Sequence, residues 1–314
     1  MVASMGVLAG CSGSGEPATT DTYKIGICQL VQHPALDAAT QGFKDALTEK
    51  LGDSVSFDEQ NASGENTNCT TINSKFVSDE VDLIMANATG SLTAAAEATQ
   101  TIPVVGTSIT DYATALGIKD WTGKTGINVT GTADLAPIAD QAAMLKELLP
   151  DAKKVGILYC SAEPNSKYQA DAFEAAIKEL GVDVKAYTFV DSNDVISVTQ
   201  QAVSECDALY IPTDNTAASN TEAINNVVEP AKIPVIAGEE GICEGCGVAT
   251  LSITYYDIGH KAGEMAYEIL VNGANPADME IEYANNLTKK YMPERAAALG
   301  ITIPDDYVAI EAAE

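Results

Sequence analysis

Small hydroxyl and glycine residues separate a mostly apolar run from a helical pattern in the first half of the chain. The run covers residues 81–88, Thr89, Gly90 and Ser91 follow it, and an alanine-rich segment comes next. The free N–H groups and the dipole of a first helical turn stabilise an anion. We therefore predict that these three residues hold an anion through backbone and hydroxyl donors. Ser91 acting only as a helix cap is the alternative.

The second half of the chain repeats this arrangement with an acid in it. A mostly apolar run over residues 206–212 leads to Thr213, Asp214 and Asn215. Asp214 is the leading candidate for binding a cation, with an Asx-turn or a helix cap as the alternative. Two facing loops, one suited to an anion and one to a cation, predict a zwitterion such as an α-amino acid between them. Both charged groups of such a ligand need partners once water is excluded.

Other polar residues stand at comparable strand ends. Two of them follow Ile-Pro-Val strands and are predicted to serve the ligand ammonium or the hinge. The others lie after the first strand of each half, where a solvated cap is the alternative. His33 adjoins this group, but a lone histidine is more often structural. The additional candidates are Gln32, Asp111, Ser161, Asn165, Ser166 and Glu239.

The charge balance of the chain excludes several classes of partner. The 314 residues include 45 acidic and 17 basic side chains, a formal net charge of -28. Such a charge opposes binding to nucleic acid and to anionic lipid surfaces. Arg295 is the only arginine, so a guanidinium clamp on a carboxylate or phosphate is almost unavailable. The length favours two domains.

The N-terminal segment carries a candidate lipidation site. Leu8, Ala9, Gly10 and Cys11 resemble the lipobox of bacterial lipoproteins, in which the cysteine is lipidated, and a polar Ser- and Gly-rich stretch follows like a tether. The basic and apolar segments that precede a lipobox are missing, so we expect residues 1–21 to be a truncated signal plus tether. No run of about 18 apolar residues follows. We therefore expect membrane attachment only through lipid on Cys11.

The remaining cysteines give no metal site. Cys243 and Cys246 form a single CxxC, whereas a structural zinc site needs a second pair. A local disulfide in that Gly-rich loop is the favoured interpretation. Cys28 and Cys206 lie in or beside apolar strand runs and are expected to be buried free thiols. We expect no metal and no cofactor.

Strand and helix patterns alternate along the chain and occur twice. The motif that begins at Lys24 returns at Lys154, and the Ile-Pro-Val motif of Ile102 returns at Ile233. We predict an α/β fold of two similar lobes, each a parallel sheet flanked by helices, with a ligand cleft at the carboxyl ends of the strands. The N-terminal lobe is assigned residues 22–132 and 253–282, and the C-terminal lobe residues 133–252 and 283–314.

Several short motifs occur in an order typical of one family. They cover residues 88–91 (Ala-Thr-Gly-Ser), 128–131 (Asn-Val-Thr-Gly), 210–216, 238–241 (Gly-Glu-Glu-Gly) and 255–259. Over about residues 22–290 the chain resembles the ABC-transporter substrate-binding lipoproteins of the tryptophan/tyrosine-binding type. The resemblance implies a type I periplasmic-binding-protein fold and capture of an amino acid, most often aromatic, by hinge closure. The sequence departs from the family pattern at Trp121 and in the loop of Cys243 and Cys246.

The sequence thus predicts a binding protein rather than an enzyme. No GxSxG, Walker A or strand-linked GxGxxG motif is present, and only His33 and His260 could act as imidazole bases. We expect a monomer, outside the cytoplasm and lipid-anchored to the bacterial cell membrane, that delivers tryptophan, tyrosine or phenylalanine to an ABC permease with its ATPase. An extracellular ligand sensor of a receptor or signalling system is the alternative function.

Overall fold

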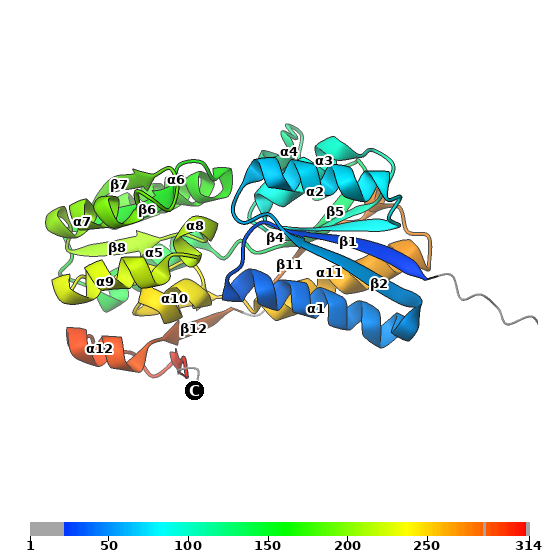
Figure 1. Ribbon diagram of the computed structural model, residues 1–314. Coiled ribbons are helices and arrows are strands. Elements are labelled where there is room, and N and C mark those ends of the chain that lie inside the picture. Colours follow the sequence, from blue (N-terminus) through cyan, green and yellow to red (C-terminus); the bar gives the residue numbers. More distant parts are fainter. Residues whose placement is uncertain (1–21, 285–286, 312–314) are drawn as a thin grey trace, which may run out of the picture.

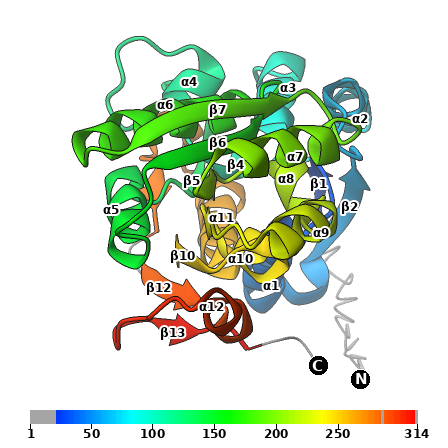
Figure 2. The ribbon, with the colours of Figure 1, turned by 90° about the vertical axis from the view of Figure 1, so that its left-hand side faces the viewer.

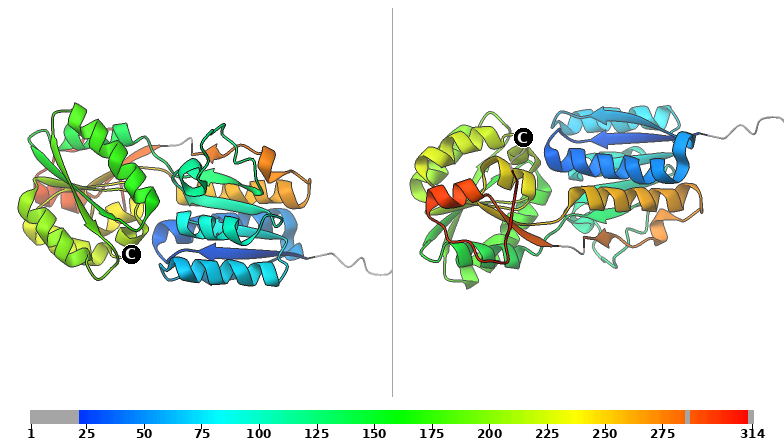
Figure 3. Two further views of the ribbon diagram at one scale, coloured as in Figure 1. Left: turned by 90° about the horizontal axis from the view of Figure 1, so that it is seen from above. Right: turned by 90° about the horizontal axis from the view of Figure 1, so that it is seen from below.

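The chain folds into two lobes that lie side by side, each built on its own β-sheet (Figure 1). The computed structural model describes residues 22–284 and 287–311. Cys11, the predicted lipidation site, lies outside these residues. Views from above and below show the N-terminal lobe and the C-terminal lobe as separate layered bodies (Figure 3).

The N-terminal lobe contains six strands. Its elements are β1 (Tyr23–Gln29), α1 (Pro34–Leu51), η1 (Gly52–Ser54), β2 (Val55–Asn61), α2 (Asn66–Ser78), β3 (Leu83–Asn87), α3 (Thr89–Ala98), β4 (Val104–Ile109), α4 (Tyr112–Leu116), β5 (Val129–Ala133), α11 (Tyr255–Leu270), η2 (Pro276–Asp278) and β11 (Glu282–Tyr283). The strand order is β11-β5-β4-β3-β1-β2, and all pairs are parallel. Strand β3 is buried along its whole length, as expected for a central strand covered by helices on both faces.

The C-terminal lobe contains seven strands. Its elements are α5 (Ile138–Leu148), β6 (Lys154–Cys160), α6 (Pro164–Glu179), β7 (Asp183–Phe189), α7 (Val195–Glu205), β8 (Ala208–Ile211), α8 (Asn215–Ala218), α9 (Thr221–Ala231), β9 (Val235–Ala237), α10 (Glu240–Cys246), β10 (Ala249–Ser252), β12 (Thr288–Tyr291), α12 (Pro293–Leu299) and β13 (Val308–Ala309). The strand order is β13-β12-β10-β9-β8-β6-β7, with β12 antiparallel to β10. Figure 2 shows β12, α12 and β13 together at one edge of this lobe. The predicted fold of two parallel sheets flanked by helices is confirmed, with β12 and β10 as the one antiparallel pair among the described residues.

The chain crosses between the sheets three times. The crossings follow β5, β10 and β11, so α11 returns to the N-terminal lobe although more than a hundred residues separate it from β5. Helix α11 packs against α1, where a Cβ on Gly42 or Gly259 would overlap the backbone of the facing helix. These glycines permit the close approach seen in Figure 3. The N-termini of α1 and α11 therefore reach the interlobe boundary together.

The CxxC segment differs from its predicted form. Cys243 and Cys246 lie in helix α10 rather than in a loop, and both are buried free thiols. The helix forms because Glu239 at its N-cap accepts hydrogen bonds from the backbone N–H groups of Gly241 and Ile242, 2.7 and 2.5 Å long. Its apolar side chains, the two thiols included, pack into the C-terminal lobe. Trp121 lies in the connector before β5 and packs against the core of the N-terminal lobe.

Candidate functional site

A small cavity lies between the two lobes, and residues that follow strands of both sheets line it. Its volume is about 10 Å³, room for about one water molecule. The lining residues are His33, Leu36, Ser108, Thr110, Asp134, Asn165, Thr213, Asp214, Asn215, Ala218, Glu239 and Tyr255. This set contains three carboxyl groups and no lysine or arginine. A closed cavity of this composition favours a ligand that carries a positive charge.

Two of the three carboxyl groups already hold helix N-termini. Asp214 accepts from the backbone N–H of Ala217 and of Cys160, both at 2.7 Å, and thereby caps α8. Glu239 caps α10 in the same way. Burial raises the pKa of Asp214 to about 8 and that of Glu239 to about 7, while the backbone hydrogen bonds act in the opposite direction. Both carboxyl groups therefore have structural partners without any ligand.

The third carboxyl group, Asp134, keeps one oxygen free. It follows β5 at the first crossing between the lobes and is 4% exposed. Its Oδ2 accepts a 2.9 Å hydrogen bond from the hydroxyl of Tyr255. Oδ1 is buried and accepts no hydrogen bond of good geometry, although the hydroxyl of Thr110 lies near enough to lower the pKa of the carboxyl. Burial raises the pKa of Asp134 to about 6. A buried carboxylate oxygen without a donor is costly, so this atom is suited to a ligand donor.

Two further unpartnered atoms belong to residues that line the same cavity. They are Nδ1 of His33 and Oγ of Ser108, and both side chains are more than nine-tenths buried. Ser108 has a φ of 58°, a left-handed conformation that is strained for a residue with a Cβ. It lies in β4, where the register with β5 shifts. Together with Asp134, these residues give the cavity three polar atoms that lack hydrogen-bond partners.

Hydrogen bonds across the lobe boundary close the cavity. Nε2 of His33, at the N-cap of α1, lies 3.3 Å from Oδ1 of Asn215 in α8. Nε2 of Gln169 in α6 donates to Oγ1 of Thr110 at 3.3 Å. Burial lowers the pKa of His33, so the neutral ring is favoured in this arrangement. The structure therefore represents a closed conformation of the two lobes.

Five of the residues predicted from the sequence meet at this cavity. They are Asn165, Thr213, Asp214, Asn215 and Glu239. Ser166 does not line the cavity, but its Oγ accepts a 3.3 Å hydrogen bond from Nδ2 of Asn165. All five belong to the C-terminal lobe.

The predicted anion-binding residues of the N-terminal lobe lie elsewhere. Thr89, Gly90 and Ser91 do not line the cavity. The hydroxyl of Ser91 is fully buried and donates to the carbonyl oxygen of Cys28 at 2.7 Å, tying α3 to β1. The side chain of Asn66 lies directly over Gly90. Asn66 itself faces an outer groove between the lobes.

Three other predicted residues also lie outside the cavity. Asp111 caps α4 by accepting from the backbone N–H of Thr114 at 2.7 Å. The hydroxyl of Ser161 donates to the carbonyl oxygen of Phe189 at 3.2 Å. Gln32 is exposed. The cavity also contains His33, Ser108, Thr110, Asp134 and Tyr255. The sequence had pointed to His33 beside the other candidates, and Asp134 had a signal that was missed, an acid directly after a strand.

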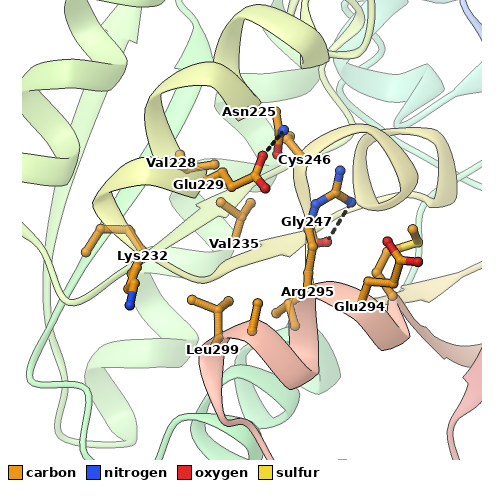
Figure 4. Close-up of a pocket in the computed structure, with 14 residues that line it drawn as sticks. Asn225, Val228, Glu229, Lys232, Val235, Cys246, Gly247, Glu294, Arg295 and Leu299 are labelled. Carbon is orange, nitrogen blue, oxygen red and sulfur yellow. Dashed lines mark hydrogen bonds between the residues drawn. The ribbon is translucent and has the colours of Figure 1, made fainter.

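A larger hollow lies on the outer side of the C-terminal lobe, between α9 and α12 (Figure 4). Its volume is about 530 Å³, and Val228, Val235 and Leu299 are among its apolar lining residues. Arg295 lines it too, but its guanidinium donates to the carbonyl oxygens of Cys243, Glu244, Gly245 and Gly247. The arginine therefore serves the C-terminal end of α10 and is remote from the interlobe cavity.

Two α/β lobes joined by three crossings, closed around a small polar cavity, define a two-lobed solute-binding protein. Among residues 22–284 and 287–311, no helix is long and apolar enough to cross a membrane. A family model described as "ABC transporter substrate binding protein" matches residues 24–314, and the chain belongs to this family. The members of this family are binding proteins of ABC transporters and work outside the cytoplasm.

Individual relatives resemble the chain over nearly its whole length. A tyrosine-binding protein of Clostridioides difficile is 39% identical over 292 residues, which are 89% of this chain and 84% of the relative. A Streptococcus pneumoniae ABC domain in complex with L-Trp superposes with a TM-score of 0.87 at 33% identity, over 90% of this chain and 96% of its own.

The arrangement of the two lobes can be compared with that of an open and of a liganded relative. The ligand-free, open structure of a Clostridium difficile substrate-binding protein with adhesive properties has a TM-score of 0.70 at 36% identity, over 93% of this chain and all of its own. The L-Trp complex is less identical in sequence but superposes better. The lobes of the present structure are thus arranged more like those of the liganded relative.

Proposed function

We propose that the protein captures an aromatic L-amino acid, tyrosine or tryptophan, and delivers it to an ABC permease. The observation that carries the proposal is the group of three unpartnered polar atoms at the interlobe cavity, on His33, Ser108 and Asp134. An ammonium group has three N–H donors, one for each of these atoms. Its charge also compensates the free carboxylate of Asp134.

The ligand carboxylate is proposed to bind at the N-terminus of a helix rather than beside the three unpartnered atoms. The N-termini of α8 and α10 are occupied by Asp214 and Glu239, whereas α1 has no side-chain cap. Leu36 in the first turn of α1 lines the cavity, so the free backbone N–H groups of that turn lie next to it. We assign the carboxylate to the α1 N-terminus, where the helix dipole favours an anion without any arginine.

The aromatic character of the ligand is supported by the relatives. One is a tyrosine-binding protein, and another was solved with L-Trp. Leu36, Ala218 and Tyr255 supply apolar surface to the cavity. The cavity has room for about one water molecule, so an amino acid enters only when the lobes are apart, and the side chains around the cavity adjust as the lobes close on its ring.

Isothermal titration calorimetry tests the proposed ligand. We expect binding of L-tyrosine or L-tryptophan at micromolar or lower Kd, and at least tenfold weaker binding of 3-(4-hydroxyphenyl)propanoate, which lacks the ammonium group. Binding of a sugar or nucleoside, with no heat from any of the twenty amino acids, would contradict the proposal.

We also propose that the protein is monomeric and is anchored to the cell membrane by lipid on Cys11. The lipobox-like sequence around Cys11 supports the anchor. Labelling cells with an alkyne fatty acid is the test. The label is expected on the wild-type protein and absent from a Cys11→Ser variant, and equal labelling of both would reject the anchor.

A further inference from the structure

The imidazole of His33 connects the ligand cavity with the opposite lobe. His33 is 7% exposed, lines the cavity, and has Nε2 within 3.3 Å of Oδ1 of Asn215. It belongs to the N-terminal lobe and Asn215 to the C-terminal lobe. A change in the protonation of this ring therefore affects both the ligand site and the contact between the lobes.

The neighbours of Asn215 determine which ring nitrogen carries the proton. Nδ2 of Asn215 donates a 2.6 Å hydrogen bond to Oε2 of Glu163, and this bond turns the amide oxygen of Asn215 toward His33. Nε2 of His33 must then be the donor. In the neutral ring the lone pair is left on Nδ1, the atom that is buried without a partner.

We infer that His33 is a protonation-dependent specificity residue for the ligand ammonium. Its neutral ring accepts a hydrogen bond from the ammonium at Nδ1 and donates one to Asn215 at Nε2, so that recognition of the ammonium and closure of the lobes use the same side chain. Protonation of Nδ1 replaces the acceptor by a donor beside a cation and opens the lobes. This inference depends on the proposed amino-acid ligand.

Charged groups on both sides of the lobe boundary act on the ring of His33. Glu163 across the boundary and Asp37 on α1 favour the charged ring, but burial outweighs both and lowers the pKa of His33. The ligand ammonium lowers it further. The open state exposes the ring, with an ordinary pKa of about 6.5. Closure therefore expels a proton from His33 below pH 6.5, and affinity falls as the pH falls.

The carboxyl groups of the cavity act in both directions. Burial raises the pKa of Asp214 and Glu239, so these two groups favour closure at lower pH. Asp134 acts in the same direction as His33 when the ligand binds, because the ammonium favours the ionised carboxyl and lower pH protonates it. The pH profile of the wild-type protein contains both contributions. The contribution of His33 is obtained by subtracting the profile of a variant without a titrating ring at this position.

Two substitutions separate the two ring nitrogens. His33→Asn places an amide oxygen near the position of Nδ1, which preserves an acceptor for the ammonium and removes the contact with Asn215. His33→Gln places an amide nitrogen near Nε2, which preserves the contact with Asn215 and removes the acceptor. His260→Asn is the matched control, because His260 lies on α11, outside the cavity, with Nε2 3.5 Å from Oε2 of Glu49.

The experiment is calorimetric titration of L-tyrosine or L-tryptophan, whichever the wild type binds, from pH 8 to pH 5. If only the neutral ring is compatible with closure, wild-type affinity falls by up to about 30-fold more than that of His33→Asn over this range. His33→Gln is expected to lose about tenfold or more at pH 8 and to discriminate less against the deaminated analogue. His260→Asn should keep the wild-type profile.

The results distinguish failure of the inference from failure of the proposed function. A wild-type protein that binds no amino acid rejects the proposed function. A wild type that binds, with both His33 variants showing its pH profile and its discrimination against the deaminated analogue, rejects the role of His33. Circular dichroism and thermal unfolding confirm that each variant is folded before it is titrated.

Discussion

Asp134 and Asp214 are both buried carboxyl groups of the cavity, but they differ in what remains free for a ligand. Asp214 accepts two backbone hydrogen bonds, whereas Asp134 has one oxygen bound to Tyr255 and the other unpartnered. A charge-assisted hydrogen bond is worth about 1.5–3 kcal/mol. The two acids are therefore expected to respond differently to substitution.

Replacing Asp134 tests the ammonium site. Asp134→Asn is expected to weaken amino-acid binding by tenfold or more, because it removes the charge that compensates the ammonium. Asp111→Asn is the control, since Asp111 caps α4 outside the cavity. Calorimetry measures both. Equal affinity of wild type and Asp134→Asn would place the ammonium elsewhere.

The same substitution is expected to stabilise the empty protein. The pKa of Asp134 is raised from 3.8 to about 6, so its carboxyl favours folding below pH 3.8 and loses that contribution as the pH rises through 6. The cost of the ionised group in the closed state is up to roughly 3 kcal/mol at pH 8. Without ligand, Asp134→Asn should therefore unfold several degrees above wild type at pH 8, and the difference should shrink by pH 4. A Tm difference that does not change with pH would contradict this account.

At the scale of elements, helix α10 joins the cavity to the outer hollow. Glu239 holds its N-terminus at the cavity, and Arg295 of α12 holds its C-terminal carbonyl oxygens. An acidic group near the N-terminus of a helix and a cation near its C-terminus both interact favourably with the helix dipole. The only arginine of the chain is thus explained by helix capping rather than by ligand binding.

Arg295→Lys tests this element. A lysine ammonium cannot reproduce the planar fork that reaches four carbonyl oxygens, so we expect a loss of about 1–2 kcal/mol and a fall of a few degrees in Tm. The substitution keeps the positive charge, so the matched control is Lys232→Arg in the same hollow, which exchanges an ammonium for a guanidinium outside this contact. Thermal unfolding followed by circular dichroism gives both values. An unchanged Tm for Arg295→Lys would mean that the guanidinium contacts contribute nothing.

For the whole molecule, the lobes are joined by three crossings and by a few polar contacts such as that of His33 with Asn215. In the closed arrangement, three buried polar atoms of residues at the cavity have no hydrogen-bond partner within the protein. A ligand that supplies their partners shifts the population toward the closed state, because it binds that state more tightly.

Small-angle scattering tests this shift. We expect the radius of gyration to fall when the amino acid is added to wild-type protein, and to fall less for Asp134→Asn at the same concentration. Saturating the variant with ligand is the control. The variant should then reach the radius of the liganded wild type, because the substitution weakens binding but leaves the hinge intact. A radius that stays constant for the wild type at saturating ligand would show that the lobes do not close on binding.

The sequence alone determined the alternation of strands and helices, the duplication into two lobes and the family. Hydrophobic periodicity and ordered motifs carry this information locally. It also predicted Asp214, Asn215 and Glu239 as ligand contacts, and these residues lie at the interlobe cavity, because acids and amides after a strand tend to stand at the edge where ligands bind.

Only the tertiary structure decided which polar atoms remain free. Ser91 follows a strand as the prediction required, but its hydroxyl donates a hydrogen bond to the carbonyl oxygen of Cys28, 63 residues away in the sequence. The side chains of Asp134 and Tyr255 form a hydrogen bond although they are 121 residues apart in the sequence, and those of His33 and Asn215 are in contact although they are 182 residues apart. Whether a buried donor or acceptor has a partner depends on such distant contacts, and no local pattern of residues encodes them.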